Sequence, residues 1–179
     1  MCDPIDGTIA FSMGEPTFMF SLALVEDGQP VVAVAADLAG GTIFSAVRGG
    51  GAFADDKPIH VSNRPIDMAL LVFPTNLGWL YEGKAMYQAL ARAAYQTNIV
   101  HGGVFKGMLV AQGLADAAIW PDTIDPWDMA AVKLIVDEAG GKFTNRKGEQ
   151  HRFDQTLNNG VIISNGVIHS ELLDIVNAS

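Results

Sequence analysis

Short apolar segments separated by turn-forming residues dominate the first third of the 179-residue chain. The pair Asp27-Gly28, which is typical of tight hairpin turns, separates the first two of these segments. This alternation predicts an antiparallel meander of strands. The expected strands occupy residues 18–26, 31–36 and 42–47, and residues 53–61 are expected to form a short pair of strands around Asp55-Asp56.

The rest of the chain alternates between strand-like and helix-like segments, which favours a parallel or mixed sheet covered by helices. In the clearest helix, residues 125–139, Asp125 can cap the start, Pro126 suits the first turn and Gly140 can end it. The expected strands are residues 69–73, 99–101, 117–120 and 161–164, and the expected helices are residues 83–95, 104–112, 125–139 and 168–176. We therefore expect an α/β fold with two subdomains, residues 1–65 and 66–179.

Composition narrows the possible functions. Apolar residues make up 49% of the chain and charged residues 17%, which excludes intrinsic disorder. A net charge of −9 argues against binding a nucleic-acid backbone, and no apolar run is long enough to span a membrane. The single cysteine, Cys2, cannot form an internal disulfide and fits a reducing compartment. No signal peptide is visible, so we expect a cytoplasmic protein. An acidic protein of this kind would need a metal cation to reverse the local field if it handled phosphates.

The first segment with candidate chemistry is Asp3-Pro4-Ile5-Asp6-Gly7-Thr8. We expect a stiff turn here that aims two carboxylates and a backbone carbonyl at one point. Hard cations such as Mg²⁺ prefer such oxygen ligands, and the N–H groups of Gly7 and Thr8 can bind an anion. A simple acidic turn with a side-chain cap explains the same residues.

The second segment is Asp125-Pro126-Trp127-Asp128-Met129-Ala130-Ala131. Asp128 falls in the first helical turn, where the helix dipole favours an ionised carboxylate. A carboxylate that only complements this dipole is the alternative explanation. Trp127 is expected to lie in the core.

Together, D-P-I-D-G-T at residues 3–8, W-D-M-A-A at residues 127–131 and E-A-G-G at residues 138–141 resemble the inositol monophosphatase family. Residues 49–53 look like the glycine-rich strand end of that family, and residues 113–116 look like its G-x-x-D turn. The resemblance covers nearly the whole chain, with a histidinol-phosphatase-like member as one option. It implies a sandwich of an antiparallel sheet and a mixed sheet with helices, lacking the N-terminal helices of the family.

The resemblance also implies a Mg²⁺-dependent phosphomonoesterase that binds two or more ions. Asp3 would bridge two metal ions, and the carbonyl of Ile5 would bind the first. Asp6 and Asp128 would bind the second. Such a site suits phosphoryl transfer, which needs charge neutralisation and positioning more than covalent catalysis.

By the same resemblance, Gly7 and Thr8 would hold the phosphate through backbone N–H groups. The Thr8 hydroxyl would orient the attacking water, so that Thr8 and Asp6 are the catalytic candidates. The substrate-binding candidates are Gly102, Gly103, Lys106 and Asp122. A solvated helix charge at Lys106 and an exposed loop carboxylate at Asp122 are the alternatives.

Histidine spacing gives no sign of a metal site. We assign no role to the four histidines, and only His101, which adjoins Gly102, is kept under consideration.

The chain departs from the family at its start, since the D-P-x-D-G-T motif begins at residue 3. Family members carry helices, a strand and a glutamate ligand before this motif. We therefore expect a truncated chain of doubtful activity, whose uncovered apolar sheet face favours a homodimer or other self-association.

Inositol monophosphate and histidinol phosphate are the expected substrates, with a nucleotide bisphosphate as a third option. A non-catalytic fragment or pseudoenzyme that binds a metal or a partner is the alternative. An unrelated acidic protein, in which both motifs are accidental, is a third hypothesis.

Overall fold

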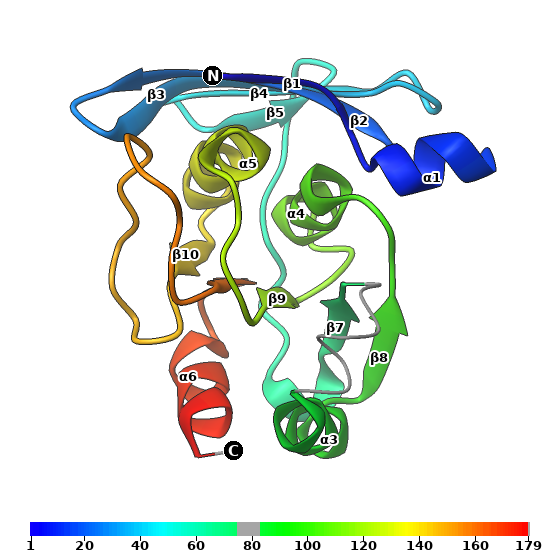
Figure 1. The fold of residues 1–179 in the computed structure, drawn as a ribbon, viewed down its shortest axis with the longest axis vertical. Coiled ribbons are helices and arrows are strands. Elements are labelled where there is room, and N and C mark those ends of the chain that lie inside the picture. Colours follow the sequence, from blue (N-terminus) through cyan, green and yellow to red (C-terminus); the bar gives the residue numbers. More distant parts are fainter. Residues whose placement is uncertain (75–82, 179) are drawn as a thin grey trace.

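The computed structural model describes residues 1–74 and 83–178, which form two sheets and two helical layers (Figure 1). Within these residues, the first sheet is antiparallel and has the order β1-β2-β3-β4-β5-β6. Its strands are β1 (Cys2–Asp6), β2 (Met19–Glu26), β3 (Gln29–Asp37), β4 (Ile43–Val47), β5 (Ala52–Ala54) and β6 (Lys57–Pro58). Asp27 and Gly28 both have a positive φ, of 51° and 76°, as a tight turn between β2 and β3 requires.

The second sheet is mixed and has the order β10-β11-β9-β7-β8, with β7 parallel to both β8 and β9. Its strands are β7 (Leu70–Phe73), β8 (Gln96–Ile99), β9 (Ala117–Trp120), β10 (Lys142–Thr144) and β11 (Val161–Ser164). The helices are α1 (Thr8–Met13), the 3₁₀ turn η1 (Ile66–Met68), α3 (Lys84–Ala93), α4 (Gly103–Ala111), α5 (Pro126–Glu138) and α6 (His169–Asn177). The expected α/β sandwich of an antiparallel sheet and a mixed sheet is confirmed.

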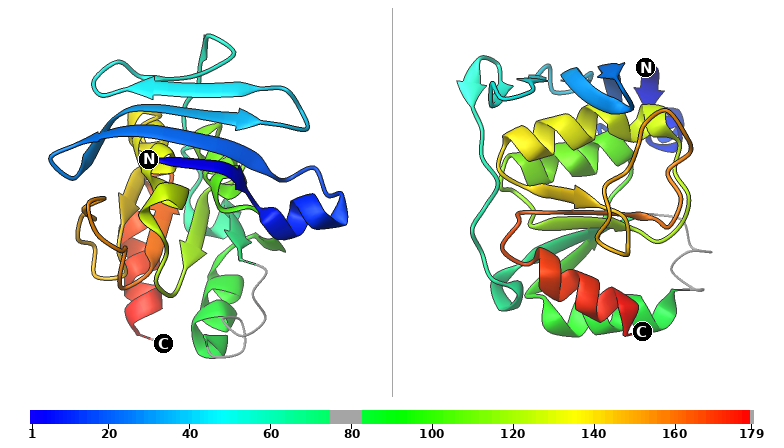
Figure 2. Two further views of the ribbon diagram at one scale, coloured as in Figure 1. Left: turned by 45° about the horizontal axis from the view of Figure 1, so that its top comes forward. Right: turned by 90° about the vertical axis from the view of Figure 1, so that its left-hand side faces the viewer.

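Helices α4 and α5 lie between the two sheets, and α3 and α6 cover the far face of the second sheet (Figure 2). Small residues on the inner face of the first sheet, among them Ala23, Ala33 and Ala35, are buried. Their size lets the backbone of α5 approach β2 and β3 closely. The first sheet and the two inner helices therefore share one core, and the start of α5 comes to lie beside β1.

The outer face of the first sheet is apolar and exposed. Leu22, Leu24 and Val32 alternate with the buried alanines along β2 and β3, and they are 44%, 53% and 38% exposed. Met1 and Val34 complete the lining of a shallow surface hollow here. In the two views of Figure 2, no helix of the described chain covers this face.

Asp116 ties the second sheet to the segment that enters it. Its buried carboxylate accepts hydrogen bonds from the hydroxyl of Ser62, from Nε of Arg64 at 2.9 Å and from the backbone N–H of Leu70 at 2.7 Å. The side-chain amide of Asn165 donates to the same group at 3.3 Å. These contacts join the G-x-x-D turn before β9 to the chain that precedes β7.

Two local expectations are wrong, and two short elements were not predicted. Residues 3–6 do not form a turn, because Cys2–Asp6 pair with β2 as an edge strand, where Pro4 needs no ladder hydrogen bond, and the chain turns only at Gly7. The strand expected at residues 99–101 lies earlier, at Gln96–Ile99, and was hidden by its polar composition. The short elements α1 and β10 had no recognisable pattern.

The division of the chain at residue 65 stays a prediction. In the described ranges, no helix has both the length and the apolar character needed to cross a bilayer.

Candidate metal centre

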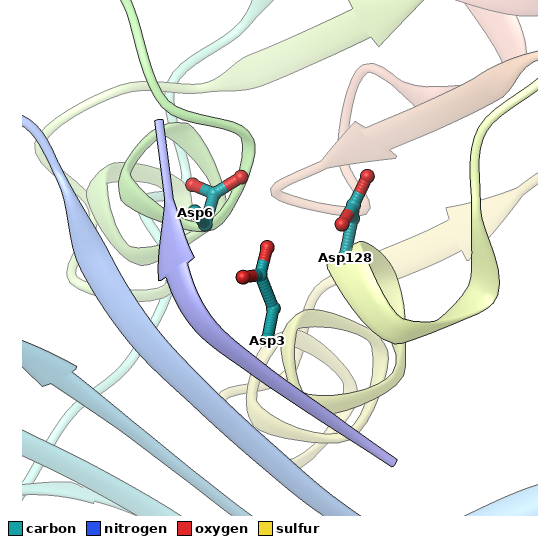
Figure 3. A group of neighbouring side chains, drawn as sticks. All are labelled: Asp3, Asp6 and Asp128. Carbon is teal, nitrogen blue, oxygen red and sulfur yellow. The ribbon is translucent and has the colours of Figure 1, made fainter. Parts of the chain in front are cut away.

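Three carboxylates from two distant parts of the chain meet beside β1. Asp3 and Asp6 come from β1 and Asp128 from the first turn of α5 (Figure 3). Each offers an oxygen, and these oxygens lie within 4.8 Å of one another. Residues three apart in a regular strand point to opposite faces, but the β1–β2 ladder carries a bulge between Asp3 and Asp6. The extra residue turns both carboxylates to the same side.

Two glycines allow the start of α4 to approach Asp6. The buried Asp6 carboxylate accepts a hydrogen bond from the backbone N–H of Val104 at 2.8 Å. A Cβ at Gly103 would lie 3.2 Å from Oδ1 of Asp6, and one at Gly102 would lie 2.2 Å from the Thr17 carbonyl oxygen. Gly102 also has a φ of 78°. These positions therefore need glycine to hold Asp6 in place, and their predicted contact with substrate stays a prediction.

Burial and neighbouring negative charge disfavour the ionised forms of Asp128 and Asp6. Burial, followed by the charges of Asp6 and Asp3 and a hydrogen bond with Asp3, raises the pKa of Asp128 to about 7. Burial also raises the pKa of Asp6, although the Val104 N–H and the charge of Lys106 counteract this rise. Among the described residues, no lysine or arginine forms an ion pair with any of the three.

A divalent cation fits this arrangement. The donors are hard carboxylate oxygens, which suit Mg²⁺, Ca²⁺ or Mn²⁺ rather than a soft metal. A bound cation would supply positive charge in direct contact with the carboxylates, whereas Lys106 acts on Asp6 without forming an ion pair. The carbonyl of Ile5, which lies in β1 between the two aspartates, keeps its predicted ligand role as a prediction.

A cavity of about 140 Å³ opens beside Asp6. Its walls combine the start of α1 with the loop that enters α4. Gly7 adopts a left-handed conformation, with φ of 80°, that turns the chain from β1 into α1. The lining residues are Asp6, Gly7, Thr8, Ile9, Ala10, His101, Gly102 and Gly103. The structure thus brings the phosphate candidates and two substrate candidates to one cavity next to the carboxylates.

Lys106 and Asp122 do not line this cavity. Lys106 is 3% exposed, and its Nζ donates to the Val100 carbonyl at 2.9 Å and lies 5.2 Å from the Trp120 ring centroid. Burial lowers the pKa of Lys106 to about 8, and the nearby charge of Asp6 opposes this shift. The alternative of a solvated charge at Lys106 is therefore wrong. Asp122 is exposed and accepts a hydrogen bond from the Thr123 N–H at 2.7 Å.

Two further side chains differ from expectation. Trp127 is 46% exposed rather than in the core, because α5 buries Pro126 and Met129 at its start instead. Glu15, to which the sequence assigned no role, pairs with His101 across the chain. No local pattern could reveal this pairing, since the two residues are 86 positions apart.

Comparison with known proteins shows what the chain and its fold are similar to. The model of the inositol monophosphatase family matches residues 1–179. The chain is 33% identical over 185 residues to "Phosphatase IMPL1, chloroplastic" of Arabidopsis thaliana, an alignment that covers 96% of the chain and 48% of that protein. It is 33% identical over 183 residues to a histidinol-phosphatase of Mycobacterium tuberculosis, covering 98% of the chain and 68% of that protein.

A solved structure, the Thermotoga maritima IMPase TM1415, superposes with a TM-score of 0.87 at 31% identity, covering 99% of the chain and 67% of that structure. The chain therefore spans from about half to about two thirds of the length of these three relatives, which are 48%, 68% and 67% covered.

Proposed function

The chain belongs to the inositol monophosphatase family, and from this premise we propose that it carries the metal and phosphate site of a Mg²⁺-dependent phosphomonoesterase. The substrate would be a small monoester of the inositol monophosphate or histidinol phosphate class, as the names of the relatives suggest. One observation carries this proposal: the meeting of Asp3, Asp6 and Asp128 within 4.8 Å. A site of this charge needs a cation before it can accept a phosphate.

The carboxylates of Asp3, Asp6 and Asp128, with the carbonyl of Ile5, would hold the metal ions. When bound, such ions neutralise the charge of the phosphate and favour deprotonation of an attacking water. Asp6 is a constrained ligand, since the Val104 N–H fixes one of its oxygens. That constraint positions the ligand before the metal arrives.

Gly7 and Thr8 would bind the phosphate through their backbone N–H groups. The first N–H groups of a helix have no partner within the helix, and Thr8 is the first residue of α1. The exposed Thr8 hydroxyl is free to orient a water molecule at the same end of the cavity. Positioning of this kind is the main contribution that a protein makes to phosphoryl transfer.

Calorimetric titration with Mg²⁺ tests the proposal. Asp6→Asn and Asp128→Asn should each weaken Mg²⁺ binding about tenfold or more, because each removes a charged ligand. Asp174→Asn, an exposed carboxylate on α6 at the opposite end of the molecule, is the matched control and should bind as the parent does (Figure 1). Release of phosphate from inositol monophosphate and histidinol phosphate is then measured on the same proteins. Equal Mg²⁺ binding in all variants would refute the shared site.

The exposed apolar face of the first sheet favours the alternative, a non-catalytic chain that binds a metal or a partner. In that case we propose self-association through Leu22, Leu24 and Val32, which project from this face. Sedimentation velocity would show a concentration-dependent dimer that Leu24→Lys reduces to monomer. A chain that stays monomeric at all concentrations would exclude self-association.

A further inference from the structure

Glu15 and His101 join the two loops on either side of the cavity. Oε2 of Glu15 lies 2.5 Å from Nδ1 of His101. Glu15 follows α1, and His101 lies between β8 and α4, so that the pair links these two segments, which lie side by side (Figure 1). The side chains are 39% and 22% exposed, which leaves both partly open to a ligand.

The pairing fixes how the imidazole of His101 can bind. An ionised carboxylate only accepts hydrogen bonds, so that Nδ1 of His101 must carry the proton that Glu15 receives. The remaining ring nitrogen, Nε2, has no hydrogen-bond partner among the described residues. In the neutral ring this nitrogen is an acceptor, and His101 is one of the residues that line the cavity beside Asp6.

The proposed function already assigns a role to the other polar side chains of the cavity. Asp6 binds metal, and the Thr8 hydroxyl orients water. Ile9, Ala10 and the three glycines of the lining offer only backbone and apolar atoms. His101 is thus the side chain left to recognise the alcohol portion of the ester.

We infer that His101 determines specificity by accepting a hydrogen bond from a hydroxyl or ammonium group in the alcohol portion of the substrate. Glu15 is a positioning residue that holds the imidazole ring. An anionic alcohol portion is disfavoured, since the Glu15 carboxylate lies directly behind the His101 ring. This inference rests on the proposed function and narrows its substrate class to neutral or cationic alcohols with a hydrogen-bond donor.

Calorimetry in the presence of Mg²⁺ tests the role of His101 with three ligands: inositol monophosphate, histidinol phosphate and inorganic phosphate. His101→Ala should weaken binding of both esters about fivefold to tenfold, as expected for one lost hydrogen bond, and leave inorganic phosphate unchanged. Glu15→Gln should weaken the esters about twofold to threefold, because the ring keeps a partner but loses its fixed proton. His60→Ala, at an exposed histidine outside the cavity lining, is the control.

Nitrogen-15 spectra of the histidine rings supply a signature that a purely structural role would not give. Nε2 of His101 should shift when either ester is added, and not when inorganic phosphate is added. If His101→Ala does not fold, His101→Phe retains a ring without nitrogens and serves the same comparison.

Three outcomes would overturn the inference. Unchanged ester binding in the His101 variants would refute it and leave the proposed function standing. An equal loss for esters and inorganic phosphate would show that His101 only supports the structure. If neither esters nor phosphate bind to the parent protein with Mg²⁺, the proposed function fails and the inference fails with it.

Discussion

Replacing Asp128 by asparagine should stabilise the metal-free protein above pH 7, although it removes a predicted metal ligand. In the folded chain, burial and the charges of Asp6 and Asp3 raise the pKa of Asp128 from 3.8 to about 7. Because the folded pKa lies above the unfolded one, ionisation of Asp128 destabilises the fold. The destabilisation is absent below pH 3.8, grows as the pH rises and is complete above about pH 7.

The size of this effect follows from the pKa difference. A rise from 3.8 to about 7 corresponds to an upper limit of about 4 kcal/mol, at about 1.4 kcal/mol per pH unit. Asp128 is only partly buried, so that solvent screening reduces the expected value to about 1–2 kcal/mol. Asparagine has nearly the same volume and no charge, and it should recover this free energy.

Urea unfolding in a metal-free buffer with a chelator measures the effect. At pH 8, Asp128→Asn should have the larger free energy of unfolding, and near pH 4 the two proteins should be nearly equal. Asp174→Asn should match the parent protein at both pH values. With excess Mg²⁺ the parent should gain stability, by about 2.7 kcal/mol at a hundredfold excess over Kd, and the variant should gain less. A variant that is no more stable than the parent at pH 8 would refute the electrostatic argument.

Three further predictions concern the scaffold. Asp116→Ala should lower the free energy of unfolding by about 3–5 kcal/mol in urea titrations, because it leaves several buried donors unpaired, and Asp174→Asn should have no effect. Burial lowers the pKa of His169 from 6.5 to about 4. The neutral ring therefore stabilises the fold, and up to about 3 kcal/mol of this stability is lost as the pH falls from 6.5 to 4. In His169→Asn, the free energy of unfolding should vary less with pH over this range. Gly107→Ala should lower the free energy of unfolding by about 1–3 kcal/mol, since the new Cβ would meet Val132 of α5. Adding Val132→Ala should restore the thermal midpoint that Gly107→Ala loses. An unchanged midpoint in Gly107→Ala would contradict this close contact.

Local signals were sufficient where the determinants lie close together in the chain. The pair Asp27-Gly28 predicted the turn between β2 and β3. The start of α5 was predicted from Asp125 and Pro126 and its end from Gly140, both to within one residue. The same reasoning missed α1 and β10, which are too short to show a period. It also mistook β1 for a turn, because edge-strand pairing with β2 outweighs the preference of proline and glycine for turns.

The candidate site likewise combines features that the sequence predicts with features that depend on the fold. Its residue types and the family resemblance were visible in the two aspartate motifs. The bulge that turns Asp3 and Asp6 to one side depends on the register of β1 against β2. The burial of Lys106 depends on how α4 packs within the fold. Neither feature can be predicted from the local sequence.

The sequence by itself determined the order of the main elements, the family and the carboxylates that a cation would need. The tertiary structure brings Asp128 to Asp3 and Asp6, as the family resemblance implied. Only the tertiary structure decided that Glu15 holds His101, and that burial and neighbouring charges raise the pKa of Asp128 to about 7. The physical reason is distance along the chain. Turns and caps are set by neighbouring residues, whereas charge coupling and burial depend on segments that the fold alone brings together.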